Sequence, residues 1–137
     1  MRTFFALCAL AFAVSGCGAT AQDSAKEFKG EEQKVAETVE RLESAARADE
    51  PARVCTALLS DDLLATLKKQ GTNCTTAVKD AIADADSFDL AVEDVTIAGD
   101  KATVEVISGK GSDEKSDTLD LARDGSAWKI ASLRAAS

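Results

Sequence analysis

The chain carries three hydrophobic patterns in succession, and the first is a short apolar run near its start. This run extends from Phe4 to Val14 and follows a single basic residue, Arg2. It is too short to cross a hydrocarbon core, which needs ~20 residues. A basic start, a short apolar run and small residues after it are typical of a signal peptide. We therefore expect residues 1–16 to be a signal peptide.

The second pattern has the period of an α-helix and occupies the middle of the chain. From about Glu31, one predicted helical face is apolar, with Val35, Val39, Leu42 and Ala46. The opposite face is charged, with Glu32, Glu40, Glu43 and Arg47. A second helix is predicted after Pro51, and its inward side contains Val54, Cys55, Leu58 and Leu59. Ser60 is a typical N-cap for a third helix, and Thr75 for a fourth.

In the third pattern, which begins after Asp86, apolar and polar residues alternate as they do in β-strands. The first strand is predicted over residues 88–97, with a bulge near Asp94. Further strands are predicted over residues 102–106, 118–123 and 128–133, joined by turns at Gly99-Asp100 and Asp124-Gly125-Ser126. In the last strand, Trp128, Ile130 and Ser132 are expected to share one face. Helices followed by an antiparallel meander predict an α+β fold, with the N-terminal helices packed on one face of a C-terminal sheet.

Between the signal peptide and the first predicted helix, the chain is short of apolar residues. The stretch from Gly18 to Ser24 is small and polar, which is typical of a flexible tether. We expect residues 17–30 to form the N-terminus and tether, and residues 31–137 to form a single domain.

The charge of the chain argues against a nucleic-acid partner. It has 137 residues, of which 16 are basic and 24 acidic, for a formal net charge of −8. Such a surface repels phosphates and offers no basic patch to anionic lipid. We therefore expect no nucleic-acid partner.

Two absent residue types limit the chemistry further. The chain has no His and no Tyr. Without His, Ser–His and Cys–His catalysis are excluded, and metal chemistry would rest on carboxylates or thiolates. The acidic residues between Asp84 and Asp94 lack the spacing and the glycine of an EF-hand, so they indicate a solvated junction. We expect no catalytic residue, no metal site and no cofactor.

The end of the first apolar run, Val14-Ser15-Gly16-Cys17, resembles the lipobox of bacterial lipoproteins. In that family a diacylglyceryl group is attached to the cysteine, and a peptidase cuts the chain just before it. The resemblance implies that Cys17 is lipidated and becomes the new N-terminus. It therefore implies an extracytoplasmic protein anchored to the bacterial cell membrane through the lipid on Cys17. The alternative is an ordinary signal peptide that is cut elsewhere.

The four cysteines divide in a way that suits this resemblance. Cys8 would leave with the signal peptide and Cys17 would be acylated, which leaves Cys55 and Cys74. An exported protein meets an oxidising compartment, where such a pair forms a disulfide. The spacing of Cys55 and Cys74 is not that of a metal site. Two buried reduced thiols are the alternative to a disulfide.

The predicted domain resembles small exported members of the nuclear-transport-factor-2-like, cystatin-like superfamily. The resemblance rests on the order of the elements and on the closing hairpin, Asp124-Gly125-Ser126-Ala127-Trp128-Lys129-Ile130. In that superfamily the sheet curls around the helices into a cone that encloses an apolar pocket. The resemblance implies a curved sheet here, with Trp128 either lining a pocket or packed in the core.

These features predict a non-enzymatic binding or scaffolding domain that holds a small apolar ligand or a protein partner. The alternative is a ketosteroid-isomerase-like pocket enzyme, which pairs a carboxylate base with Tyr or protonated Asp donors. A binding module predicts an apolar cavity with no carboxylate at its base. An enzyme predicts a buried acid with a raised pKa in the cavity. A scaffold predicts no cavity and a large exposed apolar patch.

Overall fold

The computed structural model describes residues 21–85, 88–109 and 111–135. The predicted signal peptide, Cys8 and Cys17 lie outside these residues. Six helical segments come first: η1 (Ala21–Glu27), α1 (Gly30–Arg47), α2 (Pro51–Arg53), the π-helical turn η2 (Val54–Leu58), α3 (Asp61–Lys69) and α4 (Cys74–Asp84). Then come β1 (Leu90–Ala98), β2 (Lys101–Ser108), the short helix η3 (Gly111–Asp113), β3 (Lys115–Asp124) and β4 (Ala127–Ala135).

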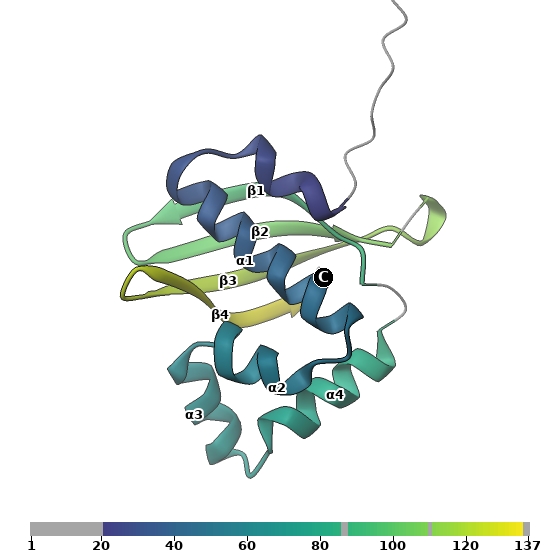
Figure 1. Ribbon diagram of the computed structural model, residues 1–137, viewed down its shortest axis with the longest axis vertical. Coiled ribbons are helices and arrows are strands. Elements are labelled where there is room, and N and C mark those ends of the chain that lie inside the picture. Colours follow the sequence, from purple (N-terminus) through teal and green to yellow (C-terminus); the bar gives the residue numbers. More distant parts are fainter. Residues whose placement is uncertain (1–20, 86–87, 110, 136–137) are drawn as a thin grey trace, which may run out of the picture.

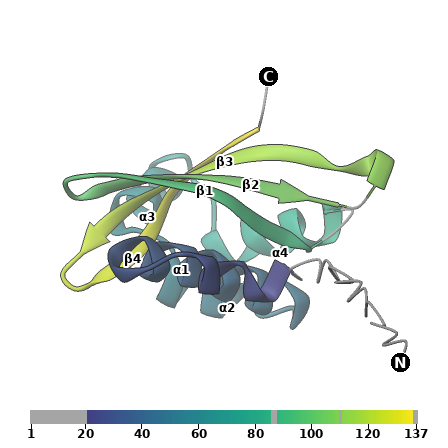
Figure 2. The same cartoon turned by 90° about the horizontal axis from the view of Figure 1, so that it is seen from above.

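The four strands form one antiparallel sheet in the order β1-β2-β3-β4, which is a simple meander. Helix α1 crosses one face of this sheet, and Figure 2 shows α1, α2 and α4 together on that side. The predicted α+β architecture, with helices packed on an antiparallel sheet, is therefore confirmed. The described residues contain no helix long and apolar enough to span a membrane.

Alternation along the strands builds the core between the sheet and α1. Strands β2 and β3 send Ala102, Val104, Val106, Leu119 and Leu121 to the helical face, where all are buried. Helix α1 meets them with Val35 and Val39, which are fully buried. The predicted bulge is present, because the pairing of β1 with β2 shifts between Val92 and Asp94.

Helix α1 is buried on more than the one face that the sequence predicts. Segment η1 packs beside it and against β1, as Figure 1 shows. The Ala25 amide donates to Glu40 Oε1 at 2.9 Å, and the Ser24 hydroxyl accepts from the Val92 amide at 3.2 Å. Both Ser24 and Ala25 are buried. The prediction of a tether over residues 17–30 is therefore wrong from Ala21 on, because this segment belongs to the folded domain.

The region after α1 departs from the predicted helices in detail. The expected second helix is a short α-helix that continues as the π-helical turn η2. Ser60 caps α3 as predicted, with its hydroxyl accepting from the Leu63 amide at 3.2 Å. The cap of α4 is Asn73 rather than Thr75, and its side chain accepts from the Thr76 amide at 3.1 Å.

Candidate functional site: an apolar cavity beneath α3 and α4

Helices α3 and α4 form a hairpin that does not pack flush against the sheet. Neither helix contains a buried residue, although Leu63, Leu67, Val78 and Ile82 are half-buried on their inner sides. In Figure 1 the pair lies beyond strand β4, below the part of the sheet that α1 covers. The apolar side of the hairpin therefore packs against the edge of the core and also borders an open space.

That space is a cavity of about 1280 Å³ between the hairpin, the end of α1 and the sheet. Its floor is formed by buried apolar residues of the sheet and of the segments around it: Ala46, Val54, Leu59, Val106, Leu119 and Ile130. Its helical wall comes mainly from Leu63, Leu67, Ala77, Val78, Ala81 and Ile82. The cavity is larger than the roughly 300–1,000 Å³ typical of small-molecule sites. Both its size and its apolar walls suit an apolar ligand.

The mouth of the cavity is acidic. It lies where the chain passes from α4 to β1 and where β2 passes to β3. Among the residues that the structure describes, five acidic side chains and one lysine line it: Asp84, Asp89, Asp113, Glu114, Asp117 and Lys115. All six are exposed or half-exposed, whereas the floor is buried. The cavity therefore combines an apolar interior with a negatively charged opening.

The disulfide holds the helical wall of the cavity in place. Cys55 in η2 is bonded to Cys74 at the start of α4, with a Cα–Cα distance of 6.1 Å. These are the two cysteines that the sequence analysis pairs. Helix α4 packs mainly on α2, η2 and α3. The disulfide thus ties the outer wall of the cavity to the segment that carries Val54, part of the floor.

A buried carboxylate lies near the cavity without lining it. The Glu43 side chain is 0% exposed, although the helical pattern places it on a charged outer face. Its Oε1 accepts a hydrogen bond of 2.7 Å from Arg47, which also pairs with Asp89. Its Oε2 has no hydrogen-bond partner among the described residues. Burial raises the pKa of Glu43, and the attraction of Arg47 offsets only part of this rise.

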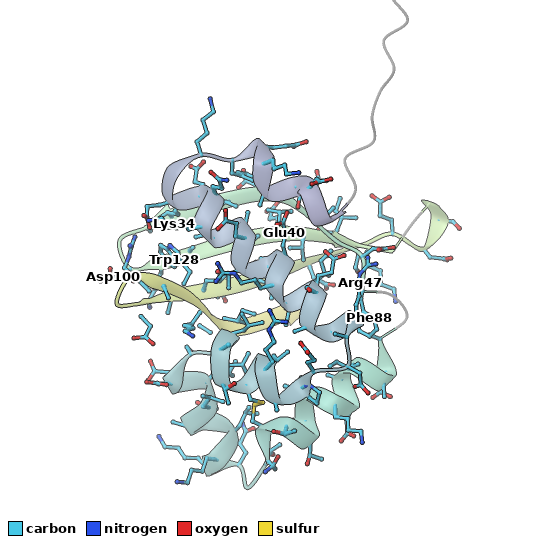
Figure 3. All side chains as sticks on the ribbon, in the orientation of Figure 1. Lys34, Glu40, Arg47, Phe88, Asp100 and Trp128 are labelled. Atoms are coloured by element: carbon cyan, nitrogen blue, oxygen red, sulfur yellow. A yellow bond between two sulfur atoms is a disulfide. The ribbon has the colours of Figure 1, made fainter. Side chains whose placement is uncertain are left out.

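Trp128 belongs to the core and not to the cavity. It is 4% exposed and is not one of the residues that line the cavity. Its indole Nε1 donates to Glu31 Oε2 at 3.1 Å, and the Arg123 guanidinium stacks over its ring at 4.5 Å from the centroid. Figure 3 shows Trp128 and Asp100 at the end of the sheet where the β1–β2 and β3–β4 turns lie, and Arg47 and Phe88 at the opposite end.

The cluster around Trp128 joins α1 to the β1–β2 and β3–β4 hairpins of the sheet. Arg123 bonds Glu31 at 3.0 Å and lies 3.5 Å from Asp100, and its backbone amide donates to the Asp100 carbonyl at 2.8 Å. The Trp128 and Lys34 hydrogen bonds lower the pKa of Glu31, with Lys34 the larger cause. These contacts hold α1 against the sheet. Trp128 therefore has a structural role in the core and does not line the cavity.

The remaining candidate chemistry is sparse. In the part of the chain that the structure describes, no three His, Cys, Asp or Glu side chains are grouped as metal ligands. The sequence predicts the third helix from its Ser60 cap, but not the cavity that Leu63 and Leu67 of this helix line. It also missed Glu43, because nothing in the periodicity signals that η1 and the start of β1 cover a second face of α1.

Comparison with known proteins supports the fold and nothing finer. No protein-family model matches this chain, and no curated protein matches it in sequence. A solved structure that is similar is that of a SEC-C motif containing protein from Rhodopseudomonas palustris. The two are 15% identical, with a TM-score of 0.54, over 89% of this chain and 96% of that one. At this identity, the likeness is one of fold alone.

Proposed function

We propose that this chain is a lipid-anchored, extracytoplasmic binding protein that holds a small apolar ligand in the cavity beneath α3 and α4. The cavity is the observation that carries the proposal. Most of its apolar wall residues are half-buried and Ala81 is exposed, so filling the space with an apolar ligand would remove more of their surface from water. A scaffold without a cavity fits this arrangement less well.

The alternative pocket enzyme would need an acid that reaches the bound molecule. Glu43 has the raised pKa that such an acid requires. However, it is paired with Arg47 and is not among the residues that line the cavity. The acids that do line the cavity lie at its solvated mouth. A binding role is therefore the better account of the cavity.

The lipid anchor would hold the mouth of the cavity close to the membrane. Ser24 is seven residues after Cys17, so an extended chain between them spans at most about 25 Å. The Ser24 hydroxyl accepts from the Val92 amide, two residues from Leu90, which lines the cavity. Figures 1 and 2 show the first residues of η1 toward the end of the sheet that carries η3. An anchored domain would therefore keep its cavity opening near the bilayer surface.

Fluorescence titration with the neutral apolar dye N-phenyl-1-naphthylamine tests the cavity directly. Dye emission should rise and saturate at one dye per chain. Ala77→Phe, which fills space in the cavity, should weaken dye binding several-fold. The matched control is Ala83→Phe, an exposed position on the same helix that does not line the cavity, and it should bind like the unaltered chain. Absence of saturable binding, or equal effects of both variants, would contradict the proposal.

A further inference from the structure

The mouth of the cavity is more acidic than the chain as a whole. Among the described residues that line it, five are acidic and one is basic. The whole chain has 24 acidic and 16 basic residues, a much smaller excess. The five acids come from separate segments: the end of α4, the residue before β1, the region around η3, and β3. Asp89 is paired with Arg47, so the charge argument rests on Asp84, Asp113, Glu114 and Asp117. The fold thus gathers negative charge at one end of an apolar cavity.

The register of the sheet explains why these acids share the opening. Asp117 is two residues before Leu119, so it lies on the same face of β3 as that buried floor residue. Leu90 pairs with Ser108, and Ser108 pairs with Lys115, so the start of β1 and the start of β3 lie at one end of the sheet. Asp89 and Glu114 immediately precede these two strands. The acidic residues at the mouth, here called the rim, therefore lie next to the buried floor residues along the same strands and belong to one site.

We infer that the occupant of this cavity is a single-chain amphiphile with a cationic head, such as an alkyl ammonium compound. The inference rests on the proposed function, because it adds a head-group preference to the apolar site. The alkyl chain would occupy the interior between Leu67 and Leu119, and the ammonium head would lie among the acids at the rim. Charge complementarity favours this class over others.

Other ligand charges fit the same site less well. A fatty-acid carboxylate would place a like charge beside Asp113, Glu114 and Asp117, which raises the cost of binding. A neutral apolar molecule would make the apolar contacts of the interior but would have no electrostatic attraction to the acids of the rim. A metal cation would use the rim but not the interior, and the described residues group no three ligands for one.

Displacement of N-phenyl-1-naphthylamine by three amphiphiles of equal chain length tests this inference. The probes are decyltrimethylammonium, decanoate and decanol, each used below the concentration at which it self-associates. Several rim charges act on one head group, and exposed charge pairs each contribute modestly. We therefore expect decyltrimethylammonium to bind about tenfold more tightly than decanoate, with decanol between them. Added salt should narrow this difference by screening the rim.

The rim variant Asp113→Asn/Glu114→Gln removes two negative charges from the mouth of the cavity with little change in side-chain size. It should weaken decyltrimethylammonium binding about threefold to tenfold and strengthen decanoate binding, each compared with the dye affinity of the same variant. The matched control is Glu105→Gln/Asp124→Asn, which removes the same charge from exposed positions that do not line the cavity. This control should leave the preference for the cation in place.

The outcomes distinguish the two proposals. If the dye itself does not bind, the proposed function fails. If the dye binds but no amphiphile displaces it, the apolar site stands and the amphiphilic ligand is ruled out. If all three amphiphiles bind alike, or decanoate binds best, the apolar site stands and the cationic ligand is ruled out. Equal loss of the preference in the rim variant and in the control would also overturn the inference, because the effect would then be one of net charge.

Discussion

Two buried polar side chains, Glu43 and Trp128, affect the stability of the folded state in opposite ways. Glu43 is the clearest case, because its carboxylate is fully buried, bonds Arg47 through one oxygen and leaves the other without a partner among the described residues. An unsatisfied buried oxygen is destabilising, and the raised pKa of Glu43 reports the same cost. Trp128, in contrast, is buried with its one polar atom bonded.

We predict that Glu43→Gln stabilises the protein more at neutral pH than at acidic pH. Because the pKa of Glu43 is raised on folding, the folded state binds the proton more tightly than the unfolded state. Glu43 therefore costs little below its unfolded pKa, and stability is lost as pH rises through its folded pKa. Urea unfolding at several pH values checks this prediction. Glu32→Gln, at an exposed position on the same helix, is the control and should have little effect. A gain from Glu43→Gln that grows toward acidic pH would contradict the account.

Trp128→Phe should destabilise the fold without weakening ligand binding. The variant removes buried volume and the hydrogen bond to Glu31, a loss of about 2 kcal/mol. Far-ultraviolet circular dichroism during urea unfolding measures the loss. Affinity for N-phenyl-1-naphthylamine should stay the same because Trp128 does not line the cavity. A strong loss of dye affinity in a folded variant would instead place Trp128 at the ligand.

At the scale of elements, the α3–α4 hairpin is the least embedded part of the helical layer. Its residues are at most half-buried, and its attachment combines the Cys55–Cys74 disulfide with packing on α2 and η2. Sheet and α1, in contrast, share a continuous core of buried residues. The hairpin is therefore the element whose position sets the size of the cavity.

Removing the disulfide should cost stability and loosen the cavity together. We expect Cys55→Ala/Cys74→Ala to lower the free energy of unfolding by about 3 kcal/mol, from the entropy of the loop that the bond closes. Dye affinity should also fall, because α4 is no longer tied to η2. Reducing agent should reproduce both effects in the unaltered chain and change nothing in the double variant. An unchanged affinity in the folded double variant would show that packing alone fixes the wall.

The elements themselves could be predicted well where a single periodicity governs them. The strands, the bulge between Val92 and Asp94, and the Ser60 cap all follow from local sequence. In β4, a second bulge shifts the pairing, so that Ser132 lies opposite Asp120 and donates to it at 2.6 Å. Strict alternation predicts that Ser132 shares the buried face of Ile130, but the register shift places it on the opposite face. Such shifts depend on the partner strand and are not visible in one strand alone.

The cavity could not be predicted from the sequence for a related reason. Leu63 and Leu67 have the spacing of an ordinary core face, and the same spacing serves a wall that faces a ligand. Only the tertiary arrangement separates the two, since it leaves the inner side of the hairpin half-buried. The burial of Ser24 depends likewise on the packing of η1 beside α1 and β1, because η1 is a short segment without clear periodicity. Glu43 lies next to the start of β1, a neighbour that the pattern of α1 alone does not indicate.

At the scale of the whole molecule, we propose that the anchor brings the cavity opening to the membrane. The described chain starts in η1, where Ser24 accepts a hydrogen bond from the amide of Val92 in β1, and Leu90 of the same strand lines the cavity. A ligand drawn from the bilayer would then have a short path into the apolar interior. The acidic rim would lie at the surface of that membrane.

Cys17→Ser should abolish acylation and the cut before residue 17 without unfolding the domain. Among the described residues, the hydrophobic core begins with Ala25, eight residues after Cys17 in the sequence. Membrane fractionation with mass spectrometry should find acylated Cys17 and no residues 1–16 in the unaltered protein, and an unacylated chain that retains residues 1–16 in the variant. Cys8→Ser is the control and should stay anchored, because Cys8 would leave with the signal peptide. Unacylated Cys17 in membrane-bound protein would contradict the anchor.

The claim that an apolar ligand occupies the cavity is tested most directly by nuclear Overhauser effects between a bound probe and the methyl groups of the protein. With bound N-phenyl-1-naphthylamine, the account predicts contacts from the dye to Leu63, Leu67, Leu119 and Ile130, which line the cavity from both sides. It predicts no contact from the dye to the Trp128 ring. Dye contacts confined to the outer face of the sheet, or to Trp128, would contradict it.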